Sequence, residues 1–355
     1  MSSPWRKLFA PALGNRAGVC YTGKENRGGG TVEHISGTDN WDLVIRRETA
    51  GITVLWAQTC EQKAALPEEL FGLPVRFLAD HALTPGRPAP EGERLRVTCG
   101  ADTAEEWDNS ALADLRLPDA LEGVGDYAFF NCSALKTLRL RDTVRHWGGG
   151  ALMNCRVLDT FHLACTGLEG ELMAYLADEL PGELDMTLTR VDGAAVRLIF
   201  PEYVEVYEEN CPAHHFDYNI YGAGYSYHHC FYRKQLSLKA YDELWRPMLG
   251  MEYDAACALR LAWWRLRYPA ELTERAEADY RAYLAAHVPA AGQWLLSEKD
   301  TEGLGTLLRS TEPTREELSA LCAMAREQER PEALALLLEA QHRRFPTGAA
   351  KSFDL

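Results

Sequence analysis

Apolar residues recur at a fixed interval of 23 positions in the middle of the chain. Between residues 112 and 163, three sets of apolar residues fall in register three times, namely Leu112, Leu135 and Leu158; Leu115, Leu138 and Phe161; and Leu117, Leu140 and Leu163. Upstream of the second and third leucines the same offset relates Ala128 to Ala151 and Cys132 to Cys155. A fixed period of this length is typical of stacked repeats, in which one unit cannot bury its own apolar face.

Each repeat predicts a short strand followed by a turn that packs behind it. The Leu-x-Leu alternation places two leucines on one side of an extended segment. The Ala-Phe-x-x-Cys-x-x-Leu run at 128–135 has the spacing of a short helical turn. Units stacked side by side would bury a continuous core and build a parallel sheet.

A family resemblance is carried by two consecutive runs, LPDALEGVGDYAFFNCSALKTLRL at 117–140 and RDTVRHWGGGALMNCRVLDTFHL at 141–163. They resemble the BspA-type leucine-rich repeat, and the segment at 66–86 is similar to the same family's first unit. The run WDLVIRRETAGITVLWA at 41–57 looks like its leading hairpin. The resemblance spans about residues 41–165, except for an insert near 84–108. It implies a leucine-rich-repeat solenoid, a bacterial source and protein binding, but no reaction.

The last third of the chain changes to a helical pattern. Thr314 and Glu317 form the sequence signature of a capping box, and Leu318 to Ala325 then follow a helical apolar period. Pro331 stands where a first helical residue is expected. This pair of helices is similar to degenerate ankyrin-type repeats, and further helices are expected at 253–268, 273–287, 289–297 and 301–309.

The predicted fold is therefore an α/β leucine-rich-repeat solenoid followed by an all-α helical-repeat domain. Residues 1–40 are an N-terminal segment, and 41–190 are the leucine-rich-repeat domain with its insert near 84–108. Residues 191–237 form an aromatic and histidine-rich connecting segment, and 238–355 form the helical-repeat domain.

Charge and composition restrict the partners. The 37 Lys and Arg residues against 52 Asp and Glu residues give a formal net charge of −15, which disfavours nucleic acid or an anionic membrane as partner. No apolar run approaches the ~18 residues of a membrane span. The first residues lack the apolar stretch of a secretory signal, and the 10 cysteines lack framework spacing. These features predict a cytoplasmic protein with reduced thiols.

The strand alternation also predicts an exposed face. If the leucines of each Leu-x-Leu point inward, then Arg116, Arg139 and His162 point outward and stack into a basic ladder about 4.8 Å apart per step. Thr137 and Thr160 flank this ladder. We expect these five residues to bind a protein partner with an acidic segment, although solubilising charge on an exposed sheet would look the same.

The connecting segment holds the residues that could carry chemistry. Cys211, His214, His229 and Cys230 supply soft ligands at a spacing that zinc would accept. The competing interpretation is aromatic and histidine packing without metal. A glutamate-rich run at 202–209 could suggest acid–base catalysis, but such a run is more often a solvated face.

The predicted function is a non-catalytic scaffold that binds a protein through its repeats, without a cofactor. Two alternatives remain open at this point. One is a metal-dependent enzyme that uses the Cys/His-rich segment. The other is a cell-surface adhesin or carbohydrate binder, since BspA-type repeats often occur on cell surfaces.

Overall fold

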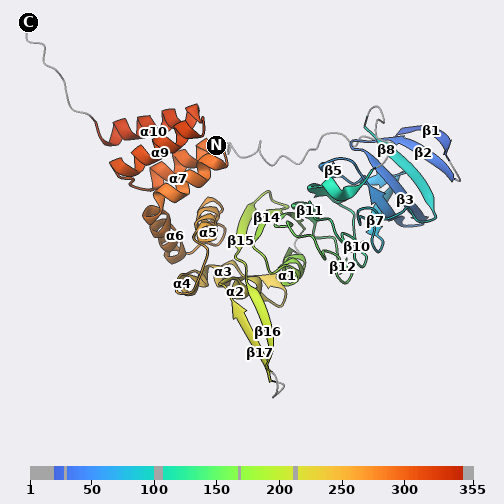
Figure 1. The fold of residues 1–355 in the computed structure, drawn as a ribbon, viewed down its shortest axis with the longest axis horizontal. Coiled ribbons are helices and arrows are strands. Elements are labelled where there is room, and N and C mark those ends of the chain that lie inside the picture. The colour runs from blue at the N-terminus through green and yellow to red at the C-terminus, as the bar shows by residue number, and fades with distance from the viewer. Residues whose placement is uncertain (1–19, 28–29, 100–106, 167–168, 211–214, 347–355) are drawn as a thin grey trace, which may run out of the picture. The chain divides into compact units, whose positions relative to one another are not determined.

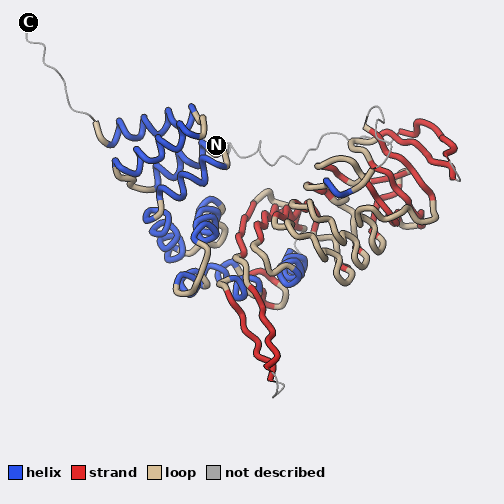
Figure 2. The backbone as a smooth tube through the Cα atoms, in the orientation of Figure 1, coloured by secondary structure: helices blue, strands red, loops and turns tan. Residues whose placement is uncertain are grey.

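The structure is a computed structural model that describes residues 20–27, 30–99, 107–166, 169–210 and 215–346 (Figures 1 and 2). It divides into two compact units. One comprises Met1–Glu179 with Asp185–Ala195, and the other comprises Leu180–Leu184 with Val196–Leu355. The repeat-rich part of the sequence thus lies in the first unit. Of the segment at 191–237, which was predicted to connect the two domains, the residues from Val196 onward are grouped with the helices.

The first unit contains a mixed sheet with the strand order β1-β2-β8-β3-β4-β7-β10-β12. In chain order, its strands are β1 (Cys20–Arg27), β2 (Gly30–Ser36), β3 (Trp41–Glu48), β4 (Gly51–Gln58), β7 (Leu73–Leu78), β8 (Glu93–Thr98), β10 (Gly123–Val124) and β12 (His146–Trp147), with β6 (Glu69–Leu70) beside β7. The leading hairpin predicted at 41–57 is confirmed as β3 and β4, which pair antiparallel.

The described part of the insert near 84–108 contributes a strand to this sheet. Its strand β8 lies between β2 and β3, pairing parallel with β2 and antiparallel with β3. Leu95 and Val97 alternate inward and are 0% and 1% exposed, which explains why the strand is held there. The boundary predicted at residue 41 therefore runs through a continuous sheet.

A second sheet of the first unit contains the strands of the 23-residue repeat. Its parallel strands lie in the order β5 (Lys63–Ala65), β9 (Asp114–Arg116), β11 (Thr137–Arg141), β13 (Thr160–Cys165) and β14 (Leu184–Arg190). Leu138 pairs with Leu115 on one side and Phe161 on the other, so the predicted repeat register is confirmed. All three side chains are 0% exposed and form part of the core.

The segments between these strands are tight turns. Where the sequence predicted a short helical turn at 128–135, Phe130 and Cys132 donate backbone hydrogen bonds to the carbonyls three residues earlier. Neighbouring turns come very close, because a Cβ on Gly125 would lie 2.5 Å from the backbone nitrogen of Asp80. A Cβ on Gly148 would lie 2.2 Å from the backbone nitrogen of Asp126, so the glycine recurs with the repeat. The last repeat is followed by α1 (Glu169–Glu179) and then by β14.

The second unit begins with β15 (Ala195–Phe200) and a two-stranded ribbon of β16 (Val204–Asn210) and β17 (His215–Tyr221). Short elements follow, namely α2 (Gly224–His228), β18 (Phe231–Tyr232), β19 (Gln235–Leu236), α3 (Leu238–Glu243) and α4 (Trp245–Leu249). Phe200 packs against Phe231, Tyr241 and His228 with ring centroids 5.7–6.2 Å apart. This aromatic cluster is the core of that part of the unit.

The remaining helices match the predicted pattern. They are α5 (Ala255–Arg267), α6 (Glu274–Ala286), α7 (Val288–Ser297), α8 (Thr301–Ser310), α9 (Arg315–Glu327) and α10 (Pro331–Arg344). The capping box is confirmed, since the Glu317 amide donates to Thr314 Oγ1 and the Thr314 amide donates to Glu317 Oε2. Pro331 is the first residue of α10, as expected.

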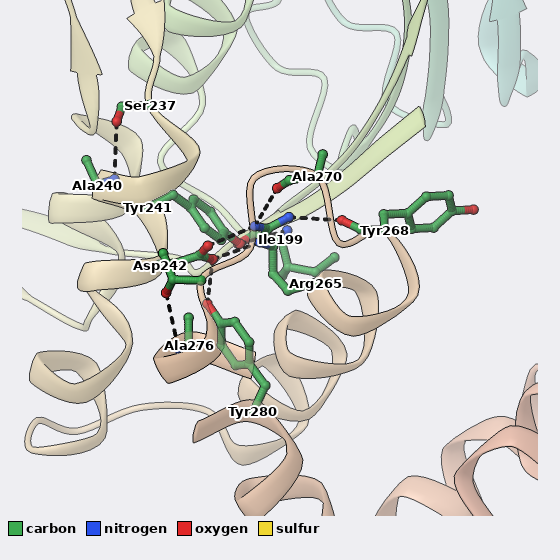
Figure 3. A network of polar contacts seen from close by, with 11 residues as sticks. Ile199, Ser237, Ala240, Tyr241, Asp242, Arg265, Tyr268, Ala270, Ala276 and Tyr280 are labelled. Carbon is green, nitrogen blue, oxygen red and sulfur yellow. Dashed lines mark hydrogen bonds and ion pairs between the residues drawn. The ribbon is translucent and has the colours of Figure 1, made fainter. Parts of the chain in front are cut away.

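A buried polar network joins α3, α5 and α6 within the second unit (Figure 3). Arg265, which is 0% exposed, donates from Nε and Nη2 to the two carboxylate oxygens of Asp242 at 2.8 Å each. Its guanidinium also donates to the carbonyls of Tyr268 and Ala270, and Tyr280 Oη donates to Asp242 at 2.8 Å. Each charge is therefore hydrogen-bonded, as a buried ion pair requires.

Candidate interaction surface

The parallel register of the second sheet arranges its outward side chains in rows across five strands. One row contains Ala65, Arg116, Arg139, His162 and Thr187, and the next contains Lys63, Asp114, Thr137, Thr160 and Asp185. Outward and inward residues alternate because successive side chains of a strand point to opposite faces. The structure thus brings together the five residues predicted from the sequence and extends both rows by one strand on each side.

Arg139, at the centre of this face, is held by a carboxylate of the neighbouring strand. Its Nε and Nη2 donate to the two carboxylate oxygens of Asp114 at 2.8 and 3.0 Å. Lys63 Nζ lies 3.4 Å from the same carboxylate. Burial opposes ionisation of Asp114, but the hydrogen bond and charge of Arg139, with the charge of Lys63, lower its pKa below the ordinary value.

Arg116 is also paired, although its side chain is half exposed. Its Nη2 lies 3.3 Å from Asp119 Oδ1 and 3.6 Å from Glu68 Oε1, both on the segments that follow the strands. Arg141 Nη2 approaches the other oxygen of Asp119 at 3.2 Å. These contacts correct the expectation of an uncompensated basic ladder: cations and carboxylates alternate on this face, and its formal charge is close to neutral.

Thr137, Thr160 and His162 are half-buried, whereas Thr187 at the β14 end of its row is buried. Thr160 Oγ1 donates to Asp159 at 2.7 Å. The face therefore offers hydroxyl, carboxylate and guanidinium groups in a fixed grid. Such an arrangement can form polar contacts with a partner.

Sequence reasoning missed Lys63, which opens the row on strand β5. The sequence does contain a signal for this row. Leu66-Pro67 is followed by acidic residues, just as Leu117-Pro118 is followed by an acidic residue. The spacing of these two runs is 51 residues and not a multiple of 23, so a fixed-period search does not align them. Asp185 and Thr187 lie beyond the residues that follow the 23-residue period, so the repeat did not align them with the face.

The structure describes two of the four predicted zinc ligands, and Cys211 and His214 lie outside the described residues. His229 follows α2, stacks on Tyr225 at 4.1 Å and places Nδ1 2.7 Å from that residue's carbonyl oxygen. His228 is buried and its Nε2 lies 2.9 Å from the Pro201 carbonyl oxygen. Among the described residues, no group of three metal-ligating side chains comes together. A zinc site that includes the other two residues stays a prediction.

The buried thiols are poorly suited to nucleophilic chemistry. Burial raises the pKa of both Cys155 and Cys230 to about 12, and it also raises the pKa of Cys132 and Cys257 well above the ordinary value. A thiol in this range carries almost no thiolate at neutral pH. Cys132 and Cys155 occupy repeat-core positions, as predicted from their register, and act as small apolar groups.

Comparisons with known proteins add one likeness. No protein-family model matches the chain, and no curated protein matches it. The crystal structure of a T. pallidum leucine-rich-repeat protein is similar, at 18% identity and a TM-score of 0.20, covering 34% of this chain and 68% of that one. A likeness of this size carries no argument about function. No helix in the described part of the chain is long and apolar enough to cross a membrane.

Proposed function

We propose that this chain is a non-catalytic scaffold that binds a protein partner across the outward face of strands β5, β9, β11, β13 and β14. The observation that carries the proposal is the grid of polar side chains held in register across that sheet. A rigid, repeated surface can match an extended or folded partner without rearrangement, and this lowers the entropic cost of binding. The resemblance of residues 41–165 to BspA-type repeats points the same way.

The charge arrangement refines the expected partner. A partner with an acidic segment was expected from the basic ladder, but Arg139 and Arg116 already have carboxylate partners in the chain itself. We infer that the partner presents a polar surface of mixed charge. Its charged groups replace one member of these ion pairs or bind to both members at once. The cytoplasmic location, the bacterial source and the ankyrin-like character of the helical unit belong to the same proposal.

The test is affinity capture from native lysate, with bound proteins identified by mass spectrometry. Reversing Arg139 to glutamate would set a carboxylate against Asp114 and disturb the sheet, so a neutral pair is the better variant. In Asp114→Asn with Arg139→Gln both charges are removed together and amide hydrogen bonds can remain. The proposal expects a specific protein captured by the wild type and lost in this variant.

The matched control is a similar pair in the second unit. Arg246 donates from Nε and Nη2 to Asp279 at 2.6 and 2.8 Å, close to the geometry of Arg139 with Asp114. Arg246→Gln with Asp279→Asn should leave capture unchanged. Equal capture by all three proteins would contradict the proposal. Stoichiometric zinc in the purified chain, with no captured protein, would favour an enzyme that uses Cys211, His214, His229 and Cys230.

A further inference from the structure

The ribbon of β16 and β17 exposes a group of large apolar and aromatic side chains. The exposed fractions are 53% for Val204, 69% for Tyr207, 45% for Tyr218, 37% for Ile220 and 56% for Tyr221. Within the described residues, neither strand pairs with any strand but the other, so both outer edges keep free backbone donors and acceptors. Figure 1 shows the ribbon extending past the helices α2 and α3 of its own unit.

Cross-strand register divides these side chains between the two faces of the ribbon. Tyr207 lies opposite Tyr218, and their ring centroids are 4.7 Å apart. Glu205 lies on that same face, and Tyr218 Oη donates to its carboxylate at 2.6 Å. This hydrogen bond fixes the tyrosine ring and raises its pKa above the ordinary value. The other face carries the pair Val204 with Tyr221.

All formal charge on the ribbon has one sign. Residues 202–221 contain five acidic residues and no lysine or arginine. Glu208 and Asp217 are directly opposed in the register, an arrangement that destabilises a sheet. In the described part of the chain no basic side chain forms an ion pair with either carboxylate. Repulsion of this kind is relieved when a cation from another molecule binds between the carboxylates.

We propose that the β16–β17 ribbon is a docking site for an arginine- and lysine-rich extended segment of another protein. The segment adds to an open edge through backbone hydrogen bonds. Successive side chains of an extended segment point to opposite faces. Cations on one side of the segment therefore pair with Glu208 and Asp217, and cations on its other side stack on Tyr207 and Tyr218. A second copy of this chain does not fit, because two acidic ribbons repel each other. Nucleic acid and anionic lipid are excluded by the same sign of charge.

This site is independent of the sheet face, since it lies in the other unit and attracts a different charge. The test uses the full chain and a fluorescein-labelled peptide of alternating arginine and threonine, titrated by anisotropy. Two ribbon variants are compared with the wild type, Glu208→Lys with Asp217→Lys and Tyr207→Ser with Tyr218→Ser. Circular dichroism verifies that both fold, as the exposure of all four side chains leads us to expect.

The control for net charge is Glu298→Lys with Glu327→Lys, which adds the same charge at exposed ends of α7 and α9. The proposal expects each ribbon variant to bind the peptide roughly tenfold or more weakly, and the control to bind it within about twofold of the wild type. Unchanged affinity in either ribbon variant, or an equal loss in the control, would overturn it. A wild-type dimer in sedimentation that the tyrosine variant dissociates would assign the ribbon to self-association and also overturn it.

Discussion

Arg139 with Asp114 and Arg265 with Asp242 are two bidentate ion pairs of nearly the same geometry in opposite surroundings. The first lies on the sheet face with side chains 36% and 20% exposed, and the second is 0% and 3% exposed. Water competes with the first pair and leaves it little net stabilisation. The second has exchanged all its water for protein hydrogen bonds, so removal of one partner leaves a buried charge. One pair is thus available to a partner, while the other holds helices together.

The largest effect should follow from breaking the buried pair. Asp242→Ala leaves Arg265 charged in the core and removes the acceptor of Tyr280, so we expect the free energy of unfolding to fall by about 3–5 kcal/mol. Urea unfolding followed by tryptophan fluorescence measures it. Asp279→Ala, which breaks the exposed pair with Arg246, should cost less than about 1 kcal/mol. Similar losses of unfolding free energy in the two variants would contradict the distinction between the buried and the exposed ion pair.

A slightly smaller loss is expected from a cavity in the repeat core. Leu138 is 0% exposed and lies on the central strand of the repeat sheet. Leu138→Ala should lower the free energy of unfolding by about 2–5 kcal/mol, because the stack cannot fully collapse around the missing atoms. The same denaturation measurement applies, with Met153→Ala as the control, since Met153 is 50% exposed on a repeat turn. Equal stability of the two variants would contradict the assigned core.

The capping box of α9 should contribute less than either core. Thr314→Ala removes the side-chain acceptor for the Glu317 amide, and we expect a cost of about 1 kcal/mol in thermal or urea unfolding. Thr314→Ser keeps the hydroxyl and should restore most of the loss. No difference between the alanine and serine variants would argue against a capping role.

The smallest effect concerns the sheet-face pair and depends on pH. Since Arg139 and Lys63 lower the pKa of Asp114 in the folded state, its ionisation adds stability above the unfolded pKa of about 3.9. That stability is lost as the pH falls through the lower folded pKa. We expect Asp114→Asn to cost less than about 1 kcal/mol at neutral pH, and nothing once Asp114 is protonated in both states. A cost that grows toward acid pH would contradict this sign.

The repeat register could be predicted from the sequence because identical spacing fixes which residues lie side by side. Leu115, Leu138 and Phe161 pair as expected for this reason. The place of β8 in the sheet could not be predicted, because the alternation of apolar residues in one segment does not indicate which strands it pairs with. The pair of Arg265 with Asp242 could not be predicted either. Its members are 23 residues apart on different helices, and charged residues are ordinarily expected to be exposed.

The candidate face was predicted in position but not in charge. Alternation placed Arg116 and Arg139 outward, but only the structure shows that Asp114 forms an ion pair with Arg139 and that Asp119 forms one with Arg116. Glu68 reaches Arg116 from the turn after the neighbouring strand, a contact that no local pattern encodes. The acidic run at 202–209 was correctly interpreted as a solvated face where its side chains are described, but the exposed tyrosines beside it were expected to pack inside.

Whether the sheet face binds a protein can be measured by titrating the captured protein against two matched variants of this chain. Thr137→Arg with Thr160→Arg puts bulk at the centre of the grid without breaking an ion pair. Met153→Arg with Val157→Arg adds the same side chains to exposed positions on a repeat turn. We expect the first variant to bind the captured protein at least about tenfold more weakly and the second to bind it like the wild type. Equal affinity of both variants, or a loss confined to the second, would contradict it.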